Sequence, residues 1–258
     1  MATLKPDIVV VHAAWHLPAA YGKFCDLVKS RGLTIHVPEL PSMNGDRPPT
    51  ADLATDTEFI RNYIVTNLLD VGRSVVVLMH SYGGQVGTNA LFGLGTKDRK
   101  AQGLPGGVSQ LVYISAAASL EGESMIDQVK RFGHMDLMPL AFDYAEDGTC
   151  VDRNPKDLVV GPGLSESELE DYVSGLTRWN GVCLYQAVDR CAWRKIPMAY
   201  VYSTNDMTLP FDYQKHMVET VQSQGVEVQT FTLETGHCPN ITKPDELAEI
   251  IEKVLESM

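Results

Sequence analysis

The sequence lacks the features that mark several large classes of protein. It has no run of about 18 apolar residues, so we predict no segment that spans a membrane. Lysine and arginine number 21 against 33 acidic residues, and both nucleic acid and anionic membranes need a basic surface. The net charge of −12 therefore argues against both as partners. No charged segment followed by an apolar one opens the sequence, so we expect no secretory signal and a cytoplasmic protein.

Cysteine is scarce and irregularly spaced. The five cysteines form no C-x-x-C pair; they are Cys25, Cys150, Cys183, Cys191 and Cys238. An odd number at uneven spacing fits reduced thiols better than a disulfide framework or a zinc site. We predict that they are small, buried apolar side chains.

Apolar runs of strand length are what the chain does have. Of its 258 residues, 44% are apolar and 21% are charged, as in soluble globular proteins. Most of the runs are continuously apolar, which is typical of parallel strands buried on both faces. The six predicted strands are Ile8–His12, Leu33–Val37, Ser74–Met79, Gln110–Ser115, Met198–Ser203 and Val226–Leu233.

Helical patterns alternate with these strands. Thr50 is placed to act as N-cap of the second predicted helix. Alternation of strands and helices predicts an α/β fold with a parallel sheet and right-handed crossovers. The predicted helices are Ala19–Ser30, Ala51–Asp70, Gly83–Leu94, Phe211–Gln224 and Asp245–Leu255.

The alternation stops between residues 118 and 196. This stretch is rich in methionine, glycine, proline and acidic residues, with helical patterns near Met125–Phe132, Ser165–Leu176 and Asn180–Ala187. An insertion of this kind usually covers the carboxyl edge of the sheet, where ligands bind. We therefore predict a core of residues 1–117 and 197–258 and a helical cap of residues 118–196.

The stretch "LMHSYGG" contains a candidate nucleophile. Ser81 follows the third predicted strand and precedes a helix, a position in which a sharp turn exposes the serine hydroxyl. The usual pattern, G-x-S-x-G, has glycine where this chain has Met79. Taken alone, Ser81 could instead be a helix N-cap.

A serine nucleophile needs a base and an orienting carboxylate, in the chain order serine, acid, histidine. Asp206 follows the fifth predicted strand and His237 the sixth, on the same edge as Ser81. Asn205 and Asp212 compete with Asp206 for the middle role.

Backbone N–H groups near Ser81 can form an oxyanion hole. Tyr82 follows the nucleophile at a helix N-terminus, and Ala14 in "HAAWH" is the preferred second donor, with Ala13 in reserve. We interpret His12 and His80 as structural side chains that orient the two loops.

With these residues in place, the chain resembles the α/β-hydrolase superfamily over nearly its whole length. It is similar to the hydroxynitrile lyase and plant methyl-ester esterase group, and to related hydrolases and cyclases of specialised metabolism. The motifs are "VHAAW", "HSYGG", "DMTLP" and "GHCPN". The resemblance implies a mostly parallel six-stranded sheet with a cap, a catalytic triad of Ser81, Asp206 and His237, and an oxyanion hole of Ala14 and Tyr82.

The chain departs from that group at three positions. Met79 and Ala13 replace glycines, and Cys238 stands where cyanohydrin-cleaving relatives carry lysine. Those relatives also have a threonine near the oxyanion loop, where this chain is rich in valine. The last two differences count against lyase chemistry.

The predicted function is hydrolysis of a small apolar ester, lactone or thioester by a serine hydrolase that needs no metal or cofactor. Alternatives are acyl transfer or macrolactone closure with the same triad, and a receptor-like ligand-binding protein. No pattern in the sequence indicates an oligomeric state. The candidate substrate-binding residues, which could equally be cap core, are Ala13, Trp15, Phe132, Trp179 and Tyr185.

Overall fold

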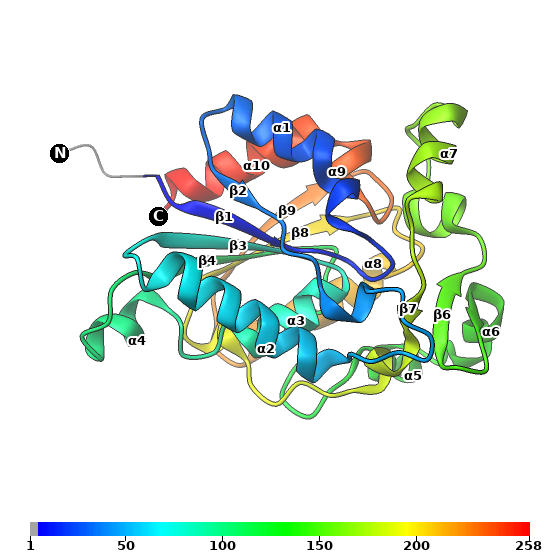
Figure 1. Cartoon of the computed structure of the whole chain (residues 1–258), viewed down its shortest axis with the longest axis horizontal. Coiled ribbons are helices and arrows are strands. Elements are labelled where there is room, and N and C mark those ends of the chain that lie inside the picture. Colours follow the sequence, from blue (N-terminus) through cyan, green and yellow to red (C-terminus); the bar gives the residue numbers. More distant parts are fainter. Residues whose placement is uncertain (1–4) are drawn as a thin grey trace.

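A six-stranded, all-parallel sheet forms the centre of the computed structural model, which describes residues 5–258 (Figure 1). Its strand order is β2-β1-β3-β4-β8-β9, and every neighbouring pair is parallel. The six predicted strands and the α/β fold are confirmed; residues 1–4 of the predicted core lie outside the described residues. The strands are β1 (Asp7–Val11), β2 (Ile35–His36), β3 (Ser74–His80), β4 (Gly107–Ile114), β8 (Met198–Ser203) and β9 (Val228–Leu233).

The central strands β1 and β3 are almost continuously apolar because both faces of the sheet are buried there, whereas the edge strand β9 is partly exposed and contains polar residues. In β3, Val75, Val77 and Met79 pack into one core, whereas Val76 and Leu78 pack into a second core on the opposite face. Successive side chains of a strand point to opposite faces, so a strand covered on both sides needs an apolar residue at every position.

Helices cover the two faces in two groups. Figure 1 shows α1 (Gly22–Ser30) and α10 (Pro244–Glu256) on one side of the sheet, and α2 (Leu53–Ile64) and α3 (Tyr82–Ala90) on the other. Side chains of α1 and α10 pack into one core, and those of α2, α3 and α8 (Phe211–Ser223) pack into the other. The remaining helices of the core region are α4 (Thr96–Ala101) and α9 (Pro239–Thr242).

Several predicted helix boundaries need correction. Asp52, not Thr50, caps α2, because its carboxylate accepts hydrogen bonds from the N–H groups of Ala54 and Thr55. The helix predicted at Gly83–Leu94 begins at Tyr82 and ends at Ala90.

The insertion between residues 118 and 196 contains strands as well as helices. Its helices are α5 (Met125–Arg131), α6 (Met138–Ala141) and α7 (Glu166–Ser174). Three short strands form an antiparallel sheet: β5 (Phe142–Tyr144), β6 (Thr149–Asp152) and β7 (Trp179–Asn180). The predicted helical cap thus also contains strands, which the sequence did not indicate because strands of two to four residues are too short to show an alternating pattern. Figure 1 shows the insertion on the right, beyond the carboxyl ends of the core strands.

All five cysteines are buried and none forms a disulfide bond, as predicted. Burial raises the pKa of the Cys238 thiol, next to His237, to about 12. Within residues 5–258, no helix has both the length and the apolar character needed to cross a membrane. In that same part of the chain, no group of three or more metal-binding side chains is arranged to hold an ion.

Candidate active site

Ser81 occupies a strained turn between β3 and α3. Its φ is 55° and its ψ is −119°, a backbone conformation that residues other than glycine rarely adopt. Such a conformation costs about 1 to 3 kcal/mol and persists only where the surroundings hold it. Here the Ser81 N–H donates to the Ile114 carbonyl at 3.3 Å, and the Ser81 carbonyl accepts from the Ala117 N–H at 3.1 Å. Both partners belong to β4 or the loop after it, so the neighbouring strand fixes the turn.

Glycines allow the first turn of α3 to approach the sheet. A Cβ on Gly83 would lie 2.0 Å from the Val11 carbonyl oxygen, and one on Gly84 would lie 2.6 Å from that of Ala117. No side chain fits at either position. The first turn of α3 therefore packs directly against the carboxyl end of β1 and the loop after β4, the two strands that flank β3.

Met79 is accommodated by a third glycine. Its Sδ lies 2.2 Å from the position that a Cβ on Gly87 would take, and the Met79 side chain is fully buried. The Met79 side chain thus fills space beneath α3 that is free because residue 87 has no side chain. The larger residue at position 79 of the strand is therefore compensated by a glycine at position 87 of the helix.

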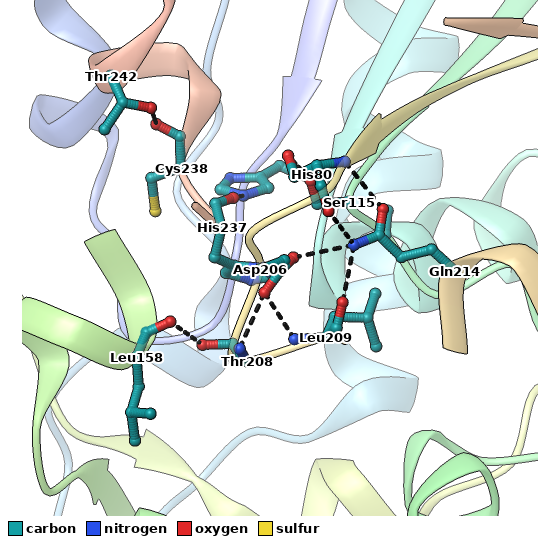
Figure 2. Close-up of polar contacts among 12 residues, drawn as sticks. His80, Ser115, Leu158, Asp206, Thr208, Leu209, Gln214, His237, Cys238 and Thr242 are labelled. Atoms are coloured by element: carbon teal, nitrogen blue, oxygen red, sulfur yellow. Dashed lines mark hydrogen bonds and ion pairs between the residues drawn. The ribbon is translucent and has the colours of Figure 1, made fainter. Parts of the chain in front are cut away.

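Asp206 and His237 meet beside this turn. The His237 Nδ1–H donates to Asp206 Oδ2 at 2.6 Å, and both side chains are buried. Figure 2 shows Asp206 also accepting hydrogen bonds from the N–H groups of Thr208 and Leu209 and from the Gln214 amide. A carboxylate held by four donors orients the imidazole with Nδ1 protonated.

The competing residues do not reach the histidine. The Asn205 backbone N–H donates to the Thr235 carbonyl, and the Asp212 side chain is 72% exposed and pairs with Lys215. Among residues 5–258, the buried Nε2 of His237 has no hydrogen-bond partner, Ser81 Oγ included. Hydrogen bonds of this kind are often long without substrate.

His12 sets the direction of the loop after β1. Its Nε2 accepts from the Leu40 N–H at 3.0 Å, so the proton is on Nδ1, which donates to the Ala13 carbonyl at 3.0 Å. The Ala13 carbonyl and the Ala14 N–H belong to one planar peptide and point in opposite directions. Holding the carbonyl therefore aims the Ala14 N–H. Burial lowers the pKa of His12 to about 4, which keeps the ring neutral.

His16, which the sequence analysis did not single out, holds the next carbonyl. Its Nδ1–H donates to Ala14 at 2.6 Å, and its Nε2 accepts from the Tyr172 hydroxyl at 2.8 Å. Burial lowers the pKa of His16 to about 3. Between them, Trp15 adopts a φ of 63°, so this loop is strained like the Ser81 turn.

A hydrogen-bonded chain links this loop to His237. The Ala13 N–H donates to the Tyr21 hydroxyl at 3.1 Å, and that hydroxyl donates to His80 Nδ1 at 2.7 Å. His80 Nε2–H donates to the His237 carbonyl at 2.7 Å. His80 and His12 therefore have the loop-orienting contacts predicted for them. The Ala13 N–H is already used, which removes Ala13 as the reserve donor.

Ala14 and Ser81 line the same cavity, which encloses about 120 Å³ between the core and the insertion. Tyr82 is the first residue of α3, so its N–H has no acceptor within the helix. Of the predicted pocket residues, Trp15 and Trp179 line the cavity, and Ala13 does not.

Two further predicted pocket residues also lie elsewhere. Phe132 stacks on Tyr213 with a ring separation of 4.5 Å and does not line the cavity. Tyr185 is 51% exposed at the surface. Neither ring is therefore part of the cavity wall that contains Ser81.

Two buried polar side chains that the sequence analysis missed support the site. Asp56 in α2 accepts hydrogen bonds from the Tyr82 hydroxyl at 2.8 Å and from the N–H and hydroxyl of Ser42. The Gln214 amide in α8 binds the backbone of Ser203 and Leu209 as well as Asp206. No sequence pattern marks either residue, because each is a single polar side chain in an otherwise ordinary helix.

The chain is similar to a known protein family and to known hydrolases and esterases. The model of the Alpha/beta hydrolase family matches residues 8–250. The chain is 28% identical over 253 residues to "Probable hydrolase R7" of a Phoma species, covering 97% of this chain and 98% of that protein. Methylesterase MES16 from Arabidopsis superposes with a TM-score of 0.77 at 14% identity, covering 98% of this chain and 100% of its own. Polyneuridine aldehyde esterase superposes with a TM-score of 0.76 at 16% identity, covering 97% of this chain and 99% of that protein. These last two likenesses show the fold.

Proposed function

The chain belongs to the alpha/beta hydrolase family, and we propose that within it the protein is a serine hydrolase acting on a small apolar carboxylic ester, lactone or thioester. The observation that carries this proposal is the 2.6 Å hydrogen bond from His237 to Asp206, at the sheet edge that carries Ser81, with His237 Nε2 left without a partner among residues 5–258. A neutral imidazole in this state can accept a proton from a serine hydroxyl.

In the proposed reaction, Ser81 Oγ attacks the carbonyl carbon while His237 Nε2 takes the hydroxyl proton. The tetrahedral intermediate collapses to an acyl-enzyme, and His237 returns the proton to the departing alkoxide or thiolate. A water molecule, deprotonated by His237, then releases the acid and restores Ser81. Asp206 holds the ring and stabilises the imidazolium in both steps.

The oxyanion formed in each step would bind the N–H groups of Ala14 and Tyr82. The Ala14 group is aimed by the His12 contact, and the Tyr82 group adds the positive end of α3. Because both donors are backbone groups, neither Ala13 nor Met79 prevents the hole from forming. Removal of one such donor in other enzymes costs about 100- to 1,000-fold in kcat.

The cavity supports an apolar substrate. Its wall includes Trp15, Trp179, Phe142, Leu184 and Met138, all of them buried side chains. The same enclosure favours a second candidate, acyl transfer or macrolactone closure, because a site that excludes water lets a substrate hydroxyl attack the acyl-enzyme. Product analysis with a linear hydroxy-acyl thioester separates the two: a free acid indicates hydrolysis and a ring indicates closure.

The direct kinetic test is Ser81→Ala against p-nitrophenyl esters. We expect the variant to lose about 10³-fold or more in kcat while keeping its fold, because the nucleophile is absent. Ser223→Ala, which removes an exposed hydroxyl at the end of α8, is the matched control and should keep full activity. Full activity in Ser81→Ala would refute the assignment, and inactivity of the wild type toward all esters would favour a ligand-binding role.

A further inference from the structure

A carboxyl group that the proposed reaction does not use faces the same cavity. Asp152 is the last residue of β6 and is 9% exposed, and it lines the cavity together with Ser81. Asp152 pairs with Phe142 across the small sheet, and Cys150, two residues before it, pairs with Trp179. Residues two apart share one face of a strand, so this face presents Asp152 between two aromatic side chains.

The local structure uses only one of the two Asp152 oxygens. Oδ1 accepts a hydrogen bond from the Asn154 N–H at 2.8 Å, which closes a turn. Within residues 5–258, Oδ2 has no hydrogen-bond partner and the carboxylate forms no salt bridge. Burial raises the pKa of Asp152 to about 6, because desolvation penalises the charged form. An asparagine would accept the same turn hydrogen bond without this penalty.

Among the described residues, two other polar side chains of the cavity wall are paired within the protein, whereas the Trp179 indole N–H has no hydrogen-bond partner. The Thr208 hydroxyl donates to the Leu158 carbonyl at 2.8 Å, and the His134 ring is hydrogen-bonded to the Tyr213 hydroxyl at 2.7 Å. Asp152 is the sole carboxylate among the described residues that line this cavity. Because Ser81 lines the same cavity, Asp152 is placed to contact a substrate bound at the nucleophile.

We propose that Asp152 is a substrate-recognition residue, and that the natural substrate carries a hydrogen-bond donor, a hydroxyl or a protonated amine, on its otherwise apolar body. This inference rests on the proposed function and names its substrate class. The donor would bind Asp152 Oδ2 while the scissile carbonyl lies at Ser81, and the aromatic side chains would enclose the apolar part. A site built around a buried acceptor rejects analogues that cannot satisfy it.

The test uses three p-nitrophenyl esters that differ by one group of equal size. They are trans-4-methyl-, trans-4-hydroxy- and trans-4-aminocyclohexanecarboxylate, together with their 3-substituted isomers. We expect wild-type kcat/KM for the hydroxy or the amino ester to exceed that for the methyl ester by about 10- to 100-fold. A preference for the hydroxy ester indicates that the natural substrate carries a hydroxyl at this position. A preference for the amino ester, which is charged, indicates an amine.

Two variants and a control assign that preference to Asp152. Asp152→Asn keeps the turn hydrogen bond and removes the charge, so it should abolish preference for the amino ester and weaken preference for the hydroxy ester. Asp152→Leu should abolish both. Asp157→Asn, an equal charge change at an exposed position on the adjoining turn, should leave both the ratios and the activity unchanged.

The inference is overturned if the wild type prefers neither the hydroxy nor the amino ester. It is also overturned if the Asp152 variants lower kcat/KM for all three esters by the same factor, so that the ratios between the esters stay as in the wild type. The second result would mean that Asp152 acts only through His237. Turnover of the methyl ester that depends on Ser81 keeps the proposed function in place in either case. If no ester is turned over, the proposed function fails and this inference fails with it.

Discussion

At the scale of single residues, the site depends on histidines whose burial keeps them neutral. The pKa is lowered to about 4 for His12 and about 3 for His16, and burial lowers that of His80 well below its ordinary value. Each ring donates from one nitrogen to a backbone carbonyl and accepts at the other. A proton added to the accepting nitrogen of any of them would break a hydrogen bond that holds the loops.

This arrangement predicts that stability falls as the pH drops below about 6.5. The unfolded chain binds protons on these histidines near that pH, whereas the folded protein does not until near pH 4 or below. Each histidine then lowers the free energy of unfolding by up to about 1.4 kcal/mol for each unit by which the pH falls. Asp152, with its pKa of about 6, and Asp56, with a raised pKa, oppose this trend, but three histidines outweigh two carboxyl groups. Urea unfolding between pH 7 and 5 measures the slope; a flat or rising stability toward pH 5 would contradict the account.

Gln214 provides a second prediction at this scale. Its side chain bridges the end of β8, the Asp206 carboxylate and the Leu209 carbonyl. Gln214→Leu leaves these buried groups unpaired and should lower the free energy of unfolding by about 2 to 4 kcal/mol. Because Asp206 loses a donor, kcat/KM should also fall, by about 10-fold. Gln222→Leu on the exposed part of α8 is the control. Unaltered kinetics with reduced stability would show that Gln214 has only a structural role.

At the scale of elements, the site is assembled where strands end and turns begin. Ser81, Ser115 and Trp15 are the described residues other than glycine with positive φ, and they follow β3, β4 and β1. These strands are neighbours in the sheet, so the three strained turns lie side by side at its carboxyl edge. The strain is held by contacts between turns, such as the Ala117 N–H to the Ser81 carbonyl.

The contact between β3 and α3 predicts coupling between Met79 and Gly87. Gly87→Ala should destabilise the protein, because its Cβ would lie 2.2 Å from Met79 Sδ. Met79→Ala leaves a cavity and should cost about 2 to 5 kcal/mol. The double variant should be more stable than the sum of the single effects predicts, because each change relieves the other. Urea unfolding of all four proteins closes the cycle, and strict additivity would show that the two positions are independent.

At the scale of the whole molecule, the insertion and the core share one hydrophobic interior. Trp179, Cys183 and Trp193 of the insertion belong to the same buried cluster as Val77 and Met79 of β3. Polar contacts also cross the boundary: the Trp15 indole N–H donates to the Cys150 carbonyl at 3.1 Å. The cavity lies within this shared interior.

We therefore predict that the insertion does not unfold separately. A single urea transition should be seen by both tryptophan fluorescence and far-ultraviolet circular dichroism, with coincident midpoints. All three tryptophans lie at or in the insertion, whereas most secondary structure belongs to the core. An earlier fluorescence midpoint would identify the insertion as a separate folding unit.

The sequence predicts the sheet well because buried parallel strands are continuously apolar, and it predicts that the loops of Ser81, Asp206 and His237 converge because strand ends share an edge. It does not predict Asp56, Gln214, His16 or Tyr21. A single buried polar residue carries no sequence pattern, whether its partners are near in the chain, as for Gln214, or far from it, as for Asp56 and Tyr21. Phe132 and Tyr185 were misassigned because the composition of an irregular insertion does not tell which way a ring points.

The central claim is that Ser81 is an activated nucleophile, and covalent labelling tests it most directly. The protein is treated with a fluorophosphonate and the modified peptide is identified by mass spectrometry. We predict one adduct per chain, on Ser81, with labelling slowed strongly in His237→Gln because the base is absent. An adduct on another residue, or unlabelled Ser81 in a protein that still hydrolyses esters, would contradict the account.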